Sequence, residues 1–381
     1  MRVSKVKPVL AVLAVLAGGA VFGQTEVNLS GQMNVISTAV PFLNISPDSR
    51  AGAMGDAGVA SLPDFNSQAW NPSKYAFLDE KFGVGVSFTP WLRHLVNDIN
   101  MYYLTGFYRL DDLQSVSASL RYFSVGSILI RETIDDNGYE VQPNEFAFDV
   151  AYHRKLSNKF AGSVAFRYIR SDLSASKIEG MEAGNSFASD VSFFFKQPLK
   201  KGKLKSDITA GVNISNIGTK ISYDGVNKEF IPTNLKIGAG YHTEIDEYNA
   251  LSFVVDFNKL LVPTPSLVAN NEADYADENK DVSVISGMFK SFGDAPGGFK
   301  EELHEISVSA GAEYWYAKQF ALRAGYFHEH ETKGNRKYVT AGAGLKFNIF
   351  NIDASYIIPM ESNNPLANTI RFSLAFNLSD L

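Results

Sequence analysis

Residues 369–378 read TIRFSLAFNL, the clearest example of a pattern that runs through most of the chain. Large apolar residues, among them Ile370, Phe372 and Leu374, occupy every second position and alternate with polar or small residues. Successive side chains of an extended chain point to opposite faces, so this period of two is typical of a β-strand with one apolar face. The same period recurs in residues 339–349 and 208–215. The sequence therefore predicts an all-β protein.

The lengths of the connections separate two kinds of all-β protein, a soluble sandwich and a membrane barrel, that alternation alone leaves open. Short connections such as residues 111–114 and 317–319 alternate with long ones such as residues 126–143 and 259–303. Short periplasmic turns and long outer loops are typical of outer-membrane barrels. We therefore expect an outer-membrane β-barrel of about fourteen antiparallel strands, with residues 281–289 in a loop or short helix. The expected strands begin near Phe82, Asp98, Ser115, Asn144, Phe160, Ser186, Ser206, Thr233, Ala250, His304, Phe320, Lys337, Asn351 and Thr369.

The composition narrows the remaining possibilities. The 381 residues contain no cysteine, which excludes disulfides and thiolate metal sites. Residues 1–23 combine basic residues, an apolar run and small residues, as a secretory signal peptide does. Its removal would take away three basic residues and make the net charge of −6 still more negative, so we expect no nucleic-acid partner. No later apolar run has the length of a spanning helix, so a membrane crossing would require a closed barrel.

Residues 41–78, PFLNISPDSRAGAMGDAGVASLPDFNSQAWNPSKYAFL, differ from the rest of the chain. They lack the alternation and concentrate glycine, alanine and proline, which favour tight turns and close backbone packing. We expect this segment, called the hatch below, to plug the lumen of the barrel. The expected division is a signal peptide at residues 1–23, an N-terminal tail and hatch at residues 24–80, and a transmembrane β-barrel at residues 81–381.

A set of residues in and after the hatch resembles a known family. Its members are Asp48, Arg50, Ala51, Met54, Gly55, Ala57, Gly58, Val59, Ala60, Asp64, Asn71 and Pro72, followed by TPWLR at 89–93 and NDIN at 97–100. The set resembles the hatch of FadL-type outer-membrane barrels and, more narrowly, the PorV family, and the resemblance extends over the chain after the signal. It implies a FadL-like barrel in the bacterial outer membrane.

The resemblance also implies a role in the type IX secretion system. The barrel would act as a shuttle that binds the C-terminal signal domain of secreted cargo at the translocon and delivers it to the cell-surface attachment complex. The implied partners are a SprA-type translocon barrel, cargo C-terminal domains and a PorU-like sortase complex, together with outer-membrane lipid.

Two groups of residues are the candidate functional positions. Apolar residues in segments expected outside the lipid, beside an arginine, indicate partner contacts: Trp91, Leu92, Arg93, Leu95, Val262 and Leu267. Trp91 fits an interface anchor equally well, and the loop of Val262 could instead fold over the lumen. The second group is expected to build the hatch: Asp48, Arg50, Met54, Asp64, Asn71 and Pro72. We expect Asp48 or Asp64 to pair with Arg50 in a structural contact.

Catalytic and metal sites receive weaker support from the sequence. No Gly-x-Ser-x-Gly elbow or His-x-Ser pair on one strand is present, so we expect no enzyme, no cofactor and no metal. His328 and His330 could share a strand face, and acidic residues at 272–281 could offer oxygen ligands, but solvated surfaces fit both better. Two alternative functions stay open: a FadL-like transporter of hydrophobic small molecules and a lipopolysaccharide deacylase.

Overall fold

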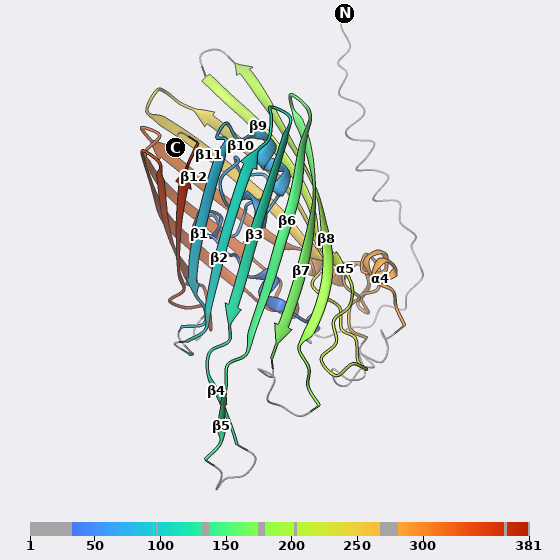
Figure 1. Cartoon of the computed structure of the whole chain (residues 1–381). Coiled ribbons are helices and arrows are strands. Elements are labelled where there is room, and N and C mark those ends of the chain that lie inside the picture. The colour runs from blue at the N-terminus through green and yellow to red at the C-terminus, as the bar shows by residue number, and fades with distance from the viewer. Residues whose placement is uncertain are drawn as a thin grey trace, which may run out of the picture.

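The computed structural model describes residues 33–93, 95–96, 98–131, 137–173, 180–201, 204–266, 281–361 and 364–379. In this part of the chain, fourteen antiparallel strands form one closed barrel in which β1 pairs with β16 (Figure 1). The strands are β1 (Phe82–Pro90), β2 (Asn100–Arg109), β3 (Gln114–Ser124), β6 (Asn144–Ser157), β7 (Phe160–Asp172), β8 (Gly184–Lys201), β9 (Leu204–Gly218), β10 (Asn234–Glu244), β11 (Asn249–Leu260), β12 (Ser307–Tyr316), β13 (Phe320–His328), β14 (Lys337–Phe347), β15 (Phe350–Pro359) and β16 (Ile370–Asn377). β4 (Ile128–Ile130) and β5 (Tyr139–Val141) form a separate two-stranded ribbon.

The predicted strands are confirmed in number and in place. The largest difference is at β12, which begins at Ser307 rather than at His304 because α5 (Gly298–His304) extends to that residue. Residues 281–289 contribute to α4 (Val284–Lys290), in agreement with the loop or short helix expected there. None of the described helices combines the length and the apolar character needed to cross a membrane.

The strands expose their apolar face and bury their polar face. In β16, Phe372 is 49% exposed while its neighbour Arg371 is 1% exposed, and Ile370 and Ser373 follow the same alternation. A soluble sandwich would show the reverse, because its apolar face would be covered by a partner sheet. The outer wall therefore faces lipid and the polar face lines the lumen.

The connections differ in length at the two ends of the barrel. At one end, called the short-turn end, the strands are joined by turns such as residues 110–113, 245–248 and 317–319. The other, the long-loop end, carries the β4–β5 ribbon and the connection of residues 261–306, which contains α4 and α5. This asymmetry assigns the short-turn end to the periplasm and the long-loop end to the cell surface.

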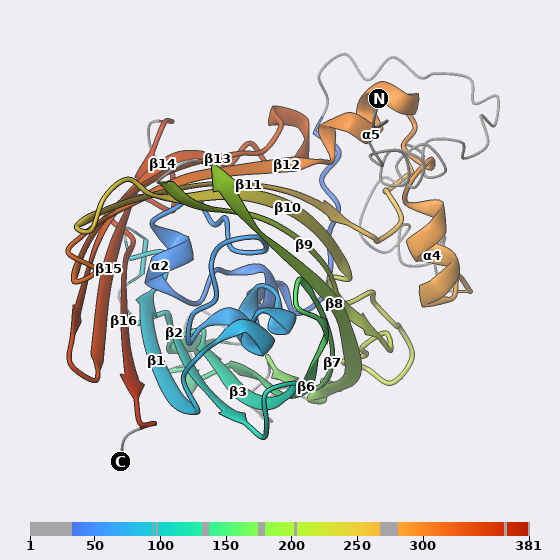
Figure 2. The same ribbon diagram turned by 90° about the horizontal axis from the view of Figure 1, so that it is seen from above.

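The hatch lies inside the ring of strands (Figure 2). It consists of short helical turns, η1 (Pro41–Asn44), α2 (Ser49–Gly52), η2 (Ser67–Ala69) and η3 (Pro72–Phe77), joined by irregular chain. Before it, the backbone nitrogen of Ala39 donates to the carbonyl of Phe230 in the β9–β10 long loop. At its last residue, the Leu78 carbonyl accepts from Arg109 at the short-turn end. The hatch therefore runs through the lumen from the long-loop end to the short-turn end.

Two apolar clusters join the hatch region to the barrel at different depths of the lumen. Near the long-loop end, Phe42 and Val40 pack with Met101 and Ile169 of the wall and with Ile231 of the β9–β10 connection. Near the short-turn end, Phe65 and Tyr75 stack on Phe107. Polar and charged side chains of the hatch and the wall lie between these clusters, and they form the site described next.

Candidate functional site: the closed lumen and the outer mouth

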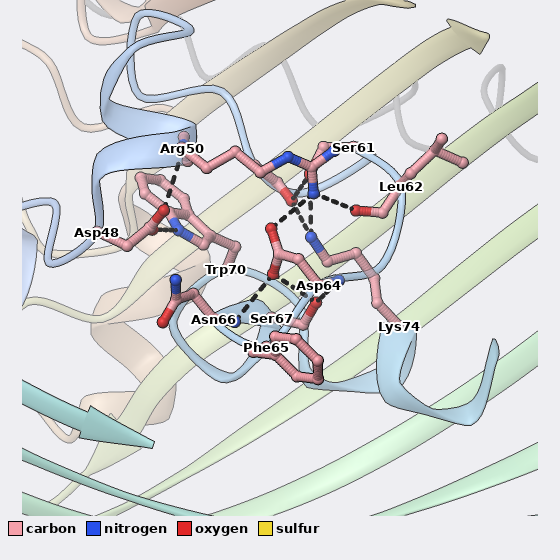
Figure 3. A network of polar contacts seen from close by, with 12 residues as sticks. Asp48, Arg50, Ser61, Leu62, Asp64, Phe65, Asn66, Ser67, Trp70 and Lys74 are labelled. Atoms are coloured by element: carbon pink, nitrogen blue, oxygen red, sulfur yellow. Dashed lines mark hydrogen bonds and ion pairs between the residues drawn. The ribbon is translucent and has the colours of Figure 1, made fainter. Parts of the chain in front are cut away.

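Arg50 joins the hatch to the barrel wall by charge. Its guanidinium contacts Glu313 of β12 through two hydrogen bonds, Nε to Oε2 at 2.9 Å and Nη2 to Oε1 at 2.8 Å. Its Nη1 donates to Asp64 Oδ2 at 2.7 Å and to the Leu62 carbonyl at 2.9 Å (Figure 3). Arginine matches a carboxylate in this two-pronged geometry, and the low polarity of the buried site strengthens each contact.

The pairing continues through the wall behind Arg50. Glu313 also accepts from Arg323 Nε of β13 at 2.7 Å, and Arg323 Nη1 donates to Asp353 of β15 at 2.6 Å. Glu313 and Arg323 are each 1% exposed in their side chains. Buried charges are tolerated only when they are paired and hydrogen-bonded, so these residues require one another.

The hatch backbone is also held directly by wall side chains. Asp256 Oδ2 of β11 accepts from the backbone nitrogens of Gly58 and Val59 at 2.7 and 2.8 Å. Thr340 of β14 accepts from the Gly55 nitrogen at 2.9 Å and donates to the Ala53 carbonyl at 2.8 Å. These bonds satisfy backbone groups that have no strand or helix partner, so an irregular segment can be buried without leaving donors unpaired.

The structure brings the six predicted hatch residues together in the lumen. Asp64 is the carboxylate that pairs with Arg50. Asp48 instead caps α2 through the Ala51 nitrogen and accepts from Trp70 Nε1. Met54 packs with Ala57 and Val254, whereas Asn71 caps η3 and donates to the carbonyls of Val59 and Phe193. Pro72 follows as the first residue of η3.

The predicted contact residues of the outer mouth differ in their exposure to solvent. Trp91 and Leu92 pack against a cluster formed by Phe327, Tyr338, Ile357 and Leu366, so each presents only part of its side chain. Arg93 is exposed and Leu95 is 61% exposed. Val262 is 0% exposed, so its expected place on a contact surface is wrong. The chain just before it continues the β10–β11 pairing through a bond from the Leu261 nitrogen to the Thr233 carbonyl, and Pro263 lies against Gly287 of α4. Leu267 lies outside the described residues.

Sequence reasoning missed the wall residues that hold the hatch, above all Glu313, Arg323 and Asp256. Each is a charged residue within a strand made mainly of apolar or small residues. A charge at such a position could have been recognised in the sequence as pointing into the lumen. The position does not identify the partner, which comes from a distant segment.

A serine and a histidine do come within hydrogen-bond reach. Ser117 Oγ lies 2.7 Å from His153 Nε2, and Ser163 Oγ lies 2.8 Å from His153 Nδ1. Both members of the first pair are buried, and the Tyr75 ring of the hatch lies 5.2 Å from the imidazole. The pair therefore faces the filled lumen and not the lipid edge, where a deacylase would meet its substrate.

Among the residues that the structure describes, no group of three or more His, Asp or Glu side chains is arranged to hold a metal ion. His330 stacks on His304 at 3.5 Å between ring centroids, and His328 lies near the Tyr326 hydroxyl. Of the acidic residues at 272–281, only Asp281 lies within the described part of the chain, where it is exposed.

These features define a class of protein: an outer-membrane β-barrel whose lumen is filled by its own N-terminal segment. The sequence matches the family described as type IX secretion system protein PorV over residues 28–267. The chain therefore belongs to the PorV family.

Three solved structures of outer-membrane transporters and channels are similar to this chain to different degrees. A TodX variant described as a monoaromatic hydrocarbon channel has a TM-score of 0.51 and 11% identity, over 87% of this chain and 99% of that one. The Pseudomonas putida toluene transporter TodX gives 0.48 and 11%, over 90% and 98%. A Pseudomonas aeruginosa FadL homologue gives 0.42 and 9%, over 91% and 99%. At 11% identity the likeness to the TodX variant supports the fold alone. No curated protein matches the chain.

Proposed function

We propose that this barrel is the shuttle of a type IX secretion system. It binds the C-terminal signal domain of secreted cargo at a SprA-type translocon barrel and delivers it to a PorU-like sortase complex at the cell surface. Membership of the PorV family supports a role in type IX secretion. The hatch inside the barrel supports binding of cargo at the outer mouth rather than passage through the lumen. Because Arg50, Asp64 and Glu313 occupy the centre of the lumen, cargo is held at the outer mouth and does not pass through the barrel.

The exposed residues of the β1–β2 loop are the proposed contact. Arg93 and Leu95 are exposed beside Trp91 and Leu92, which are fixed by the cluster around Phe327. A rigid apolar base with an exposed leucine and arginine at its edge has the character of a protein-binding hot spot. This role involves no catalysis. The buried Ser117–His153 pair is then a structural hydrogen bond between neighbouring strands.

Transport of hydrophobic small molecules fits the lumen less well. An apolar ligand needs an apolar path, whereas the centre of this lumen carries the paired charges of Arg50, Glu313, Arg323 and Asp353. Passage would require those pairs to separate in a medium of low polarity, which is costly.

The test compares two outer-loop variants of a tagged copy expressed in its native host. Arg93→Glu combined with Leu95→Asp changes the proposed contact, and Val226→Asp changes an equally exposed residue of the β9–β10 loop as a control. After gentle detergent extraction, mass spectrometry identifies what co-purifies with each.

We expect secreted proteins that share one C-terminal domain to accompany the unaltered protein and the control and to be depleted with the double variant. Equal recovery from all three would remove the β1–β2 loop from the contact. Recovery of small apolar ligands alone from all three would overturn the shuttle and favour the transporter.

A further inference from the structure

The connection between β11 and β12 contains a helix that buries its charged side chains and exposes its apolar ones, the reverse of the arrangement expected in water. α5 turns the carboxylates of Glu301 and Glu302 toward the protein, where both residues are buried. On its opposite side Phe299 is 75% exposed, and Leu303, one turn later, is also exposed. A helix on a water-facing surface buries its apolar stripe and exposes its charges. The outer side of α5 is therefore suited to an apolar medium.

Ion pairs fix α5 in this orientation. Lys259 at the end of β11 contacts Glu302 at 3.0 Å and Glu305 at 2.5 Å. Lys333 in the β13–β14 connection contacts Glu301 at 2.6 Å and Glu305 at 3.0 Å. Rotating the helix to bury its apolar side would leave these buried charges without partners, which is strongly unfavourable.

α4 presents a second apolar stripe. Ile285 and Phe289 are four residues apart in the helix, so they share one side, and both are exposed, Phe289 by 76%. Phe292, which is also exposed, follows in the turn after the helix. Gly287 is buried against Phe230 and Pro263, and a side chain there would lie about 3.1 Å from the Phe230 ring. The glycine brings α4 close to the loops beneath it and leaves the stripe facing outward.

The position of the two helices indicates which medium they meet. Figure 2 shows both outside the ring of strands and not over its mouth. Figure 1 shows them beside the long-loop ends of the strands, whereas the β4–β5 ribbon projects beyond the barrel. The lipid-facing wall nearby exposes Ile237 and Phe257, which pair across β10 and β11. The stripes therefore continue the lipid-facing surface at the level of the outer membrane boundary.

We propose that α4 and α5 form an anchor that lies in the outer leaflet, with the side chains of Ile285, Phe289, Phe292, Phe299 and Leu303 among the lipid chains. Lys290 and Lys300 are exposed on the same helices, where they can meet anionic headgroups. Both helices lie beyond residues 28–267, which the family match covers. The anchor fixes the largest outer loop at the rim of the barrel.

The test uses the absence of native cysteine, which allows one nitroxide label at a time. Phe289→Cys and Phe299→Cys place the label on the proposed anchor. Phe166→Cys, on the exposed wall of β7, provides the lipid reference, and Val226→Cys, in the outer β9–β10 loop, provides the water reference. Each purified full-length barrel is placed in nanodiscs of phosphatidylethanolamine and phosphatidylglycerol. Its heat-modifiable migration confirms folding, and relaxation by oxygen and by a water-soluble nickel complex reports the depth of the label.

We expect the labels at 289 and 299 to resemble the label at 166, with oxygen accessibility severalfold above that found at 226 and with little exposure to nickel. Nickel exposure equal to that at 226 would overturn the proposal. That result would mean that the apolar side chains of α4 and α5 contact water in the isolated barrel and are available to bind a protein partner.

Discussion

Arg50 illustrates how much of the closure of the lumen depends on single side chains. It reaches Asp64 within the hatch and Glu313 in the wall, so one guanidinium neutralises two carboxylates from parts of the chain far apart in sequence. The contact is shielded from solvent, and its loss would leave an unpaired carboxylate in the lumen. Breaking such a pair costs far more than losing an exposed one.

Replacing Arg50 with methionine should loosen the hatch. The expected loss in free energy of unfolding is about 3 kcal/mol, because Asp64 loses its ion pair and keeps only the more distant charge of Lys74, and Glu313 keeps only Arg323. Urea unfolding of the barrel in lipid vesicles measures this loss. In planar bilayers the variant should also pass ionic current that the unaltered protein does not pass.

The matched control is Lys318→Met, which removes an ion pair to Glu244 at the short-turn end, where both side chains are exposed. Its effect on unfolding should stay within about 0.5 kcal/mol. A similar effect of the two substitutions would show that Arg50 does not secure the hatch.

Neighbouring strands supply a shallow channel of glycines for the hatch. Gly311 of β12, Gly325 of β13 and Gly342 of β14 lie directly against Ala53 and Met54. At Gly325 an added Cβ would fall 2.0 Å from the Gly55 nitrogen, so the hatch backbone touches the wall there. Only a residue without a side chain permits that approach.

Gly325→Ala should therefore displace the hatch and destabilise the barrel by roughly 2 kcal/mol, the usual cost of overpacking. Gly106→Ala on β2 is the control, because its added Cβ would lie 3.7 Å from the nearest atom, an ordinary contact. Urea unfolding and hydrogen exchange of residues 53–58 measure both. Equal behaviour of the two variants would contradict the close approach.

The contact between α5 and the β13–β14 connection should loosen in acid. His304 and His330 stack there, and burial, aided for His304 by Lys300 and for His330 by His304, lowers the pKa of each below 6.5. The detached imidazoles bind protons more readily, so stability is lost as pH falls below about 6.5. The hydrogen-exchange protection factors of residues 298–305 and 328–336, which are corrected for the intrinsic pH dependence of exchange, should therefore fall between pH 7.5 and pH 5.

His304→Phe keeps a stacked ring and removes one titrating group, so the fall in the protection factors should become smaller. Burial and the charge of Glu302 raise the pKa of Asp294 to about 6, which favours the folded loop in acid. This opposing effect is present in both proteins, and the difference between them isolates the histidine pair. An unchanged pH dependence in the variant would exclude the pair as its source.

For the whole molecule, the alternation of short turns and long loops fixes its orientation in the outer membrane. Cysteine introduced at Val226, in the β9–β10 long loop, should react with a membrane-impermeant maleimide on intact cells. Cysteine introduced at Glu247, in the β10–β11 turn, should react only after the outer membrane is permeabilised. Labelling of Glu247→Cys alone on intact cells would reverse the orientation.

The barrel could be predicted from the sequence alone. The period of two in residues such as Ile370, Phe372 and Leu374, together with the loop lengths, predicted fourteen strands and the positions at which they begin. These are local properties, because each strand carries its own alternation and each turn its own length. The family resemblance of the hatch could likewise be read from contiguous residues.

The contacts between distant residues became visible only in the folded protein. Arg50 pairs with Asp64 and Glu313 and not with Asp48, Val262 is buried, and α5 carries its charges inward. These outcomes depend on the register that places β11 to β14 around the hatch, and on how the connection between β11 and β12 packs. Alternation specifies the two faces of a strand but not the distant segment that will cover each face.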